Sequence, residues 1–303
     1  MTTLPDPPSL SARATELETA AAPLVAHWNA SLAAHVLYLA LNLKCMADSR
    51  HLPRLAEAAK GLVHFLHHRM NQGHGTVDMH KSIVVSCNTY YYQLGRDMGI
   101  DAIHDFMKPF GFGQLTGIDL NNEKTGVLPS TEWKRNRFKT PQQKKWVGGD
   151  TISVSNGSGY NSYTPLQIAH ATANLANNGV VMKPHLVKII EDAATRARTL
   201  TVPKESYRIA LKQENIDTIK RAMVGVTSEQ GGTAARIFAG VQYTVGGKTG
   251  TAQVVGIKKN EKYNAKLLAE RLRDNALFTA FAPADKPRIA IAIVVENAGF
   301  GAG

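Results

Sequence analysis

The sequence predicts an α/β (α+β) fold, with helices along much of the chain and β-strands near its C-terminal end. From Gly73 onward, helical patterns alternate with turns that are marked by glycine. Runs of β-branched and apolar residues appear late, at 241–245, 276–281 and 288–295. The last run, RIAIAIVV, alternates and then becomes continuous, as expected of a central strand covered on one or both faces.

The first 72 residues differ in composition from the rest of the chain. They are rich in Ala, Leu, His and Arg. Helices are plausible over 12–43 and 54–70, although the capping residues there do not match the limits of the apolar periodicity. Six of the eleven histidines lie in this part: His27, His35, His51, His64, His67 and His68. Two interpretations stay open: an unusual but genuine helical region, or a segment that is not native to the domain after it. We therefore expect an atypical region at 1–72 and a separate domain at 73–303.

Composition and charge limit the classes of partner. With 303 residues, 44% of them hydrophobic and 19% charged, the chain has a globular composition and ample core. A net charge of +11 and a pI near 9.6 favour an acidic partner. Nucleic acid is the weakest candidate, since no basic motif interleaved with aromatics and no zinc-finger spacing occurs. The basic run KRNRFKTPQQKKW at 134–146 is predicted to be a solvated loop, with attraction to anionic glycan polymers or lipid head groups as the alternative.

Targeting signals are not evident in the sequence. No stretch reaches the roughly 18–20 apolar residues of a membrane span, and the N-terminus lacks the pattern of a signal peptide. Cys45 and Cys87 are too few for a disulfide framework. As written, the chain is predicted to be soluble, without an export signal.

A lysine motif carries part of the candidate chemistry. In VGGKTGTAQV (245–254), an edge strand would place the ammonium of Lys248 and the hydroxyls of Thr249 and Thr251 along a groove. Glycine beside them allows the backbone of a ligand to approach closely. Taken alone, the motif is more typical of an exposed turn with a surface lysine. A phosphate-binding loop is excluded, because the earlier glycine at the required spacing is missing.

A second motif, Ser86-x-Asn88, lies in SIVVSCNTYYYQLG (82–95). Alone it is typical of a junction between helix and loop, with Cys87 as a small buried hydrophobe. Together with Lys-Thr-Gly the pair is far more specific, because both belong to the motif set of penicillin-binding proteins and class A β-lactamases.

Residues 73–303 resemble the transpeptidase domain of class B penicillin-binding proteins, of the penicillin-binding protein 2 type that works in cell elongation. Other segments carry the resemblance as well: FGFGQLTGIDL, GDTISVSNGSGYNSYTPLQIAHATANLANNG, GGTAARIF and LFTAFAPADKPRIAIAIVVEN. The resemblance implies a penicilloyl-serine-transferase (β-lactamase/transpeptidase-like) fold. Such a fold has a five-stranded antiparallel sheet flanked by helices, plus a helical lobe, with the active site between them.

The resemblance also implies roles for the motif residues. Ser86 would relay protons, Asn88 would hold the substrate amide, and Lys248 would supply positive charge at the substrate carboxylate. The expected substrate-binding residues are Thr249, Gly250 and Thr251. The hydroxyls of the two threonines would bind the carboxylate, and the backbone N–H of Thr251 would be one donor of the oxyanion hole.

The nucleophile motif of the family is missing from this sequence. In the family, the serine of Ser-x-x-Lys attacks, and the lysine one turn later deprotonates it. No serine of this chain is followed by lysine three positions later; Ser130 has one at four. A catalytically incomplete chain is therefore the alternative to an active transpeptidase.

A zinc site is a further implication of the resemblance. Some relatives hold zinc beside the active site, with a cysteine and a histidine at positions that match Cys87 and His74. Thiolate, imidazole and carboxylate ligands suit tetrahedral zinc. A reduced core cysteine and a turn histidine are the alternative, and no cofactor is required for the expected chemistry.

Three functions remain open. The first is a serine-type D,D-transpeptidase that cross-links peptidoglycan stem peptides ending in D-Ala-D-Ala and binds β-lactams. The second is a remnant that binds such ligands without turnover. The third, a β-lactamase or β-lactam sensor, ranks last because we identify no deacylating base. The resemblance implies the bacterial inner membrane, facing the periplasm, and partners that include a membrane glycosyltransferase and elongation-complex proteins, with no nucleic acid.

Two geometric expectations test this interpretation. Residues 241–255, 276–283 and 288–296 should form adjacent antiparallel strands with Lys248 on an edge. The side chains of Ser86, Asn88 and Lys248 should converge, because a proton relay and a carboxylate anchor must act on one substrate.

Overall fold

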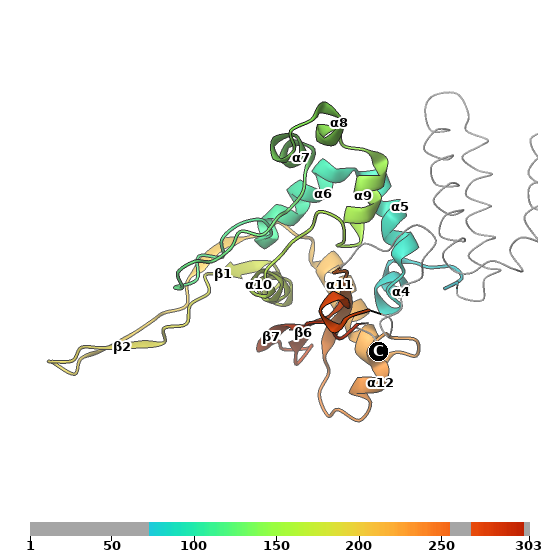
Figure 1. Cartoon of the computed structure of the whole chain (residues 1–303). Helices are drawn as coiled ribbons and strands as arrows, with labels where there is room; N and C mark the ends of the chain where they lie inside the picture. Colours follow the sequence, from blue (N-terminus) through green and yellow to red (C-terminus); the bar gives the residue numbers. More distant parts are fainter. Residues whose placement is uncertain (1–72, 255–267, 300–303) are drawn as a thin grey trace, which may run out of the picture. The chain divides into compact units, whose positions relative to one another are not determined.

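The structure, a computed structural model, describes residues 73–254 and 268–299 (Figure 1). Residues 77–255 and 265–303 form one compact unit, which holds all the helices and strands named below. Residues 73–76 group with a different unit, most of which lies outside the described ranges. The interpretations of residues 1–72, and the boundary at residue 73, therefore stay predictions.

Helices predominate over strands in the described chain before residue 240. The α-helices are α4 (Met79–Val84), α5 (Asn88–Met98), α6 (Ile100–Met107), α7 (Thr131–Arg137), α8 (Pro141–Lys144), α9 (Gly148–Ser155), α10 (Pro165–Ala176), α11 (Gln213–Ser228) and α12 (Ala235–Phe238). Short 3-10 helices occur at η1 (Lys108–Phe110) and η3 (Glu270–Leu272). The first of several caps is Asp78, whose carboxylate accepts a hydrogen bond from the N–H of Lys81 and starts α4.

The main sheet consists, in its described part, of three antiparallel strands in the order β5–β6–β7. These are β5 (Gly246–Ala252), β6 (Asn275–Ala282) and β7 (Ile289–Val295). The expectation of three adjacent antiparallel strands is confirmed. The five-stranded count stays a prediction, because the described residues supply three.

Two sequence expectations are corrected. The apolar run at 241–245 does not form a strand; β5 begins at Gly246, directly after it. The basic run at 134–146 is not a loop, because much of it lies in α7 and α8. Hydroxyl caps explain this second difference: Ser130 accepts from the N–H of Trp133, and Thr140 from the N–H of Gln143.

The core lies between α11 and the sheet. Phe281 of β6 is 1% exposed and packs with Ala222 and Val226 of α11, both fully buried. Helix α11 contacts β5 and α4, and α10 contacts β6 and β7. Gly247 allows this packing, because a Cβ there would lie 2.6 Å from the ring of Phe278. Helix α11 therefore packs both against β5, which carries Lys248, and against α4, which precedes Ser86.

In the described chain, two smaller sheets follow α10: β1 lies beside this helix, and β2 lies on an arm that projects away from it (Figure 1). Strand β1 (Val180–Met182) pairs with β4 (Glu205–Arg208), and β2 (Ile189–Glu191) pairs with β3 (Arg198–Leu200). Both pairs are antiparallel, and neither includes a predicted site residue.

Candidate functional site

Ser86 lies in a tight turn between α4 and α5. Its φ is 54°, in the left-handed region that a residue with a side chain rarely adopts. The turn is closed by backbone hydrogen bonds from the N–H of Ser86 to Ile83 O at 3.2 Å and from the N–H of Cys87 to Ser82 O at 2.8 Å. Strained conformations of this kind cost on the order of 1 kcal/mol and persist where the surrounding structure holds them. Here the turn fixes the backbone position of Ser86 between the two helices.

Lys248 reaches this hydroxyl from the sheet. It lies on β5, an edge strand of the described sheet, opposite Thr279 of β6. Its Nζ donates a hydrogen bond to Ser86 Oγ at 2.7 Å and another to the carbonyl of Thr249 at 2.9 Å. The expectation that Ser86 and Lys248 converge across 162 residues of sequence is confirmed.

The ammonium of Lys248 has no negatively charged partner among the residues that the structure describes. Within the described residues, no carboxylate bonds to it, and its two acceptors are a hydroxyl and a carbonyl. Burial lowers the pKa of Lys248 from 10.5 to about 8, because a desolvated ammonium is disfavoured. Close to neutral pH the group is therefore a cation available to an anionic ligand. A rise of about one pH unit above neutral is enough to populate its neutral form.

The two threonines of the lysine motif differ in access. Thr249 is 9% exposed, and its hydroxyl is hydrogen-bonded to the hydroxyl of Thr233 at 2.8 Å. Thr251 is exposed, and Gly250 lies opposite Leu277. Of the two threonines expected to bind a carboxylate, Thr251 is the more open to a ligand.

Thr233 was missed by sequence reasoning, although it ties the two halves of the site together. Its N–H donates to the carbonyl of Val84 at 3.3 Å, two residues before Ser86, and its hydroxyl meets Thr249, one residue after Lys248. The only sequence signal is the paired glycine that precedes it in GGTAARIF.

Asn88 begins α5 and is exposed. Its side chain makes no hydrogen bond within the described ranges, which leaves the amide open to a ligand two residues from Ser86. The roles assigned to Asn88 and to the other motif residues stay predictions.

The described residues do not complete a zinc site. Cys87 is a free thiol, 3% exposed, at the start of α5. His74 belongs to the other compact unit, so its position relative to Cys87 is left open. In the part of the chain that the structure describes, no three His, Cys, Asp or Glu side chains gather in a way that could hold a metal ion. Zinc binding stays a prediction.

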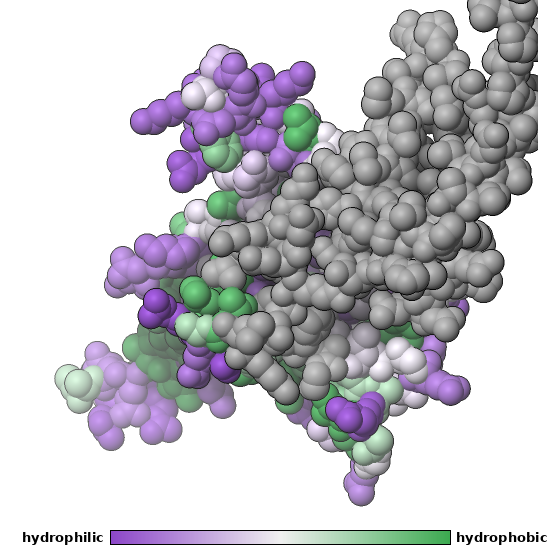
Figure 2. Space-filling model, turned by 45° about the vertical axis from the view of Figure 1, so that its right-hand side comes forward, coloured by the Kyte–Doolittle hydropathy of each residue, from purple (hydrophilic) through white to green (hydrophobic). Residues whose placement is uncertain are grey.

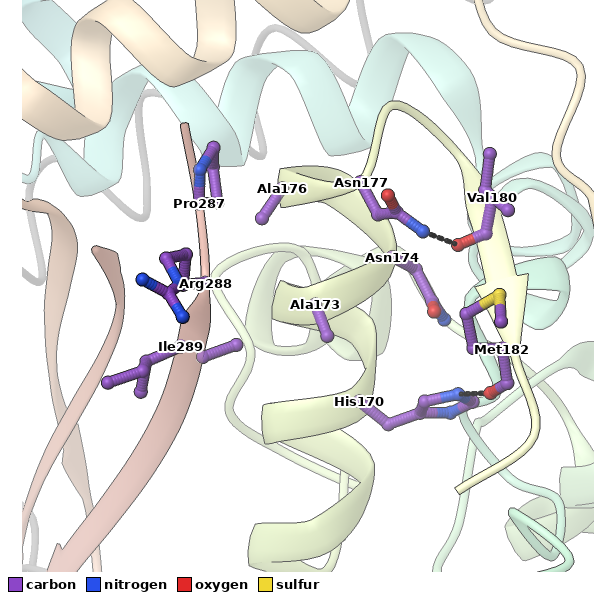
Figure 3. A pocket seen from close by; sticks show the side chains of 11 residues that line it. His170, Ala173, Asn174, Ala176, Asn177, Val180, Met182, Pro287, Arg288 and Ile289 are labelled. Atoms are coloured by element: carbon purple, nitrogen blue, oxygen red, sulfur yellow. Dashed lines mark hydrogen bonds between the residues drawn. The ribbon is translucent and has the colours of Figure 1, made fainter. Parts of the chain in front are cut away.

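A separate hollow of about 210 Å³ lies between α10, β1 and the start of β7 (Figure 3). His170 lines it and bonds through Nε2 to the carbonyl of Met182 at 3.0 Å. Because a carbonyl only accepts, Nε2 carries the proton. None of the predicted site residues lines this hollow.

Comparison with protein families agrees with the site geometry. Residues 40–303 match the model of the penicillin binding protein transpeptidase domain. The chain belongs to this family. The match begins before residue 73, where the sequence suggested a boundary. The α+β transpeptidase fold predicted from the sequence is therefore confirmed.

Relatives of this transpeptidase family include two curated proteins named peptidoglycan D,D-transpeptidase MrdA. The one from Haemophilus influenzae is 45% identical over 237 residues, and the one from Escherichia coli K12 is 42% identical over 229. Each alignment covers 76% of this chain but 34% and 35%, respectively, of the relative. The chain thus spans about a third of the length of these relatives.

Solved structures place the chain with the penicillin-binding protein 2 type, as predicted. PBP2 of Pseudomonas aeruginosa, in complex with WCK 5153, is 36% identical with a TM-score of 0.63, covering 77% of this chain and 47% of that one. PBP2 of Helicobacter pylori, in complex with MreC, is 30% identical with a TM-score of 0.63, covering 76% and 38%. No helix in the described ranges combines the length and apolar character needed to cross a bilayer.

Proposed function

We propose that this chain forms the substrate-binding part of a peptidoglycan D,D-transpeptidase domain. Its ligands are stem peptides that end in D-Ala-D-Ala, and β-lactams. The observation that carries the proposal is the 2.7 Å contact between Lys248 Nζ and Ser86 Oγ, in which a desolvated ammonium meets a hydroxyl. This is the arrangement needed to anchor a carboxylate and to pass a proton beside it.

The strand and the turn supply different parts of the binding site. The edge of β5 offers main-chain groups to an extended peptide, and Lys248 offers the charge that a terminal carboxylate needs. Thr251 is exposed on the same strand, with its N–H proposed as an oxyanion donor. In this proposal Asn88, just after the turn, holds the substrate amide, and Ser86 on the turn relays protons.

We further propose that the chain binds these ligands without forming an acyl-enzyme. No serine of the 303 residues has lysine three positions later, so the usual activated nucleophile is missing. One observation favours the opposite outcome. Because Lys248 contacts Ser86 and has a pKa of about 8, its neutral form is a candidate base for Ser86 itself.

Labelling with a fluorescent penicillin separates the two outcomes. The full chain is incubated with the probe and then boiled and run on denaturing electrophoresis, with Ser86→Ala and Lys248→Met run beside it. We expect no labelled band from any of them, and displaceable binding to the unsubstituted chain in a non-denaturing assay. A boiling-stable band that disappears in Ser86→Ala would show that Ser86 acts as the nucleophile. No binding of either kind would overturn the proposed function.

The proposal also covers the cellular location and the protein partners of the domain. By analogy with its relatives, the domain would act at the bacterial inner membrane, facing the periplasm, with a glycosyltransferase and elongation-complex proteins. The Helicobacter pylori PBP2 structure in complex with MreC supports a partner of the second kind. Co-purification with such a partner tests this point separately from ligand binding.

A further inference from the structure

Five cationic side chains gather on the neighbouring helices α7 and α8, in the turn between them and just after α8. All are exposed, and in the described part of the chain none of them forms an ion pair. They are Arg135, Arg137, Lys139, Lys144 and Lys145, and we call them the α7–α8 basic surface. Helices α7 and α8 pack against each other, and Glu132 is the acidic residue of α7. Positive charge therefore predominates at this end of the molecule, which Figure 2 shows as mostly hydrophilic.

The basic surface is held on a fixed scaffold. Lys134, next to one of the exposed cations in sequence, turns inward and pairs with Asp150 at 2.5 Å. The rings of Trp146 and Tyr160 lie 5.5 and 5.3 Å from its Nζ. Trp133 packs on Tyr160, with centroids 5.2 Å apart, and completes the support under α7. A run of cations in a mobile loop would lose entropy on binding, whereas this arrangement is ordered before any ligand arrives.

The surface is connected to the candidate site through two helices. Helix α9, which comes after α8, carries Asp150 and packs along α5. Asn88 is the first residue of α5. The basic surface and the Ser86 turn therefore lie on one compact unit, and a long ligand held at one is available to the other.

We propose that the α7–α8 basic surface binds a carboxylate-bearing polymer, the uncross-linked peptidoglycan strand. The identity of the polymer rests on the proposed function. A strand repeats its carboxylates along its length, so several weak contacts act together and raise the local concentration of stem peptides. A bilayer fits less well, because amphipathic helices that lie in a membrane interface combine cations with an apolar face. Here the exposed large apolar side chain next to the five cations is Val147, while the aromatic rings face the scaffold.

The test measures binding of soluble, uncross-linked peptidoglycan strands to the full chain by co-sedimentation or fluorescence anisotropy. One variant neutralises the basic surface: Arg135→Gln, Arg137→Gln, Lys139→Gln, Lys144→Gln and Lys145→Gln. The matched control removes the same charge from scattered exposed positions: Lys183→Gln, Lys188→Gln, Lys204→Gln, Lys212→Gln and Lys286→Gln. Unfolding temperature and circular dichroism confirm that both variants fold.

The basic-surface variant should bind strands about tenfold or more weakly, and the control should lose no more than about threefold. Affinity of the unsubstituted chain should fall as ionic strength rises from about 0.05 to about 0.3 M. Equal losses in the two variants, or no loss in the first, would overturn the inference. So would a loss confined to phosphatidylglycerol vesicles, which would make the partner a membrane.

Failure of the proposed function gives a different pattern. If the site proposal alone is wrong, a short D-Ala-D-Ala peptide does not bind, yet strand binding still depends on the five cations. If the surface proposal alone is wrong, the peptide binds and its affinity falls in Lys248→Met. Neutralising the five cations then leaves the affinity for strands unchanged.

Discussion

Lys134 and Lys248 are both largely withdrawn from solvent, yet their electrostatic surroundings are opposite. Lys134 is paired with Asp150 at the corner of α7 and α9. Burial lowers the pKa of Lys134, but the hydrogen bond and charge of Asp150, followed by those of Tyr160, together offset this and leave the pKa raised. Lys248 has two neutral oxygens as acceptors, and burial lowers its pKa to about 8. The comparison separates a lysine that holds the scaffold together from one that is available for chemistry.

Removal of the paired lysine should have the largest effect. Lys134→Met leaves the carboxylate of Asp150 without its cation in a low-dielectric corner, so we expect a loss of about 3 kcal/mol in the free energy of unfolding. Chemical denaturation measures it. Lys134→Met with Asp150→Asn removes the stranded charge, keeps an acceptor for the N–H of Val147, and should restore part of the loss. A single substitution with no effect would mean that the ion pair is not formed.

Removal of the ammonium of Lys248 should change the free energy of unfolding in the opposite direction. Lys248→Met replaces an ammonium that burial disfavours with an apolar side chain of similar length. We expect the free energy of unfolding at neutral pH to rise by about 2 kcal/mol, while binding of a D-Ala-D-Ala peptide is lost.

The stability gained in Lys248→Met should depend on pH, because the pKa of Lys248 is lower in the folded state than in the unfolded state. Below about pH 8 Lys248 is protonated in both the folded and the unfolded state, so the cost of burying the charge is fully present. Between about 8 and 10.5 the folded state releases its proton first, and the cost is relieved. The stability difference between Lys248→Met and the unsubstituted chain should therefore shrink as pH rises through this range. A difference independent of pH would argue against a desolvated ammonium.

Peptide affinity should vary with the same ionisation. Affinity for a peptide with a free carboxylate should be flat below about pH 8 and then fall about tenfold per pH unit, because the neutral amine cannot pair with the carboxylate. Lys248→Arg is the control, since its guanidinium keeps its charge across this range and should give a flat profile. Isothermal titration calorimetry at several pH values measures both.

Much of this comparison was visible in the sequence, but not all of it. The pairing of Ser-x-Asn with Lys-Thr-Gly predicted that Ser86 and Lys248 meet, and the alternation in RIAIAIVV predicted β7. The partner of Lys134 could not be predicted, because Asp150 lies one helix away and its approach depends on how α9 packs. Thr233 was missed for the same reason: its bonds to Val84 and Thr249 exist only after three segments have folded together.

The sequence also contains no sign of how the serine half of the site is held. Nothing in Val-Val-Ser-Cys-Asn shows that Ser86 has a positive φ, since serine has no preference for that region. Strain at a single position is set by the helices on either side, here α4 and α5.

That strain leads to the smallest and most local prediction. Ser86→Gly removes both the Cβ that makes φ of 54° unfavourable and the hydroxyl that Lys248 contacts, whereas Ser86→Ala removes the hydroxyl alone. Glycine also raises the entropy of the unfolded chain, which works against it. Because the left-handed region costs a residue with a Cβ on the order of 1 kcal/mol, we expect Ser86→Gly to be more stable than Ser86→Ala by about 0.5 kcal/mol. Both should lose peptide affinity equally, since both lack the hydroxyl. Urea denaturation of the two variants, measured side by side, decides the point: if the alanine variant is the more stable of the two, the turn at Ser86 is not strained.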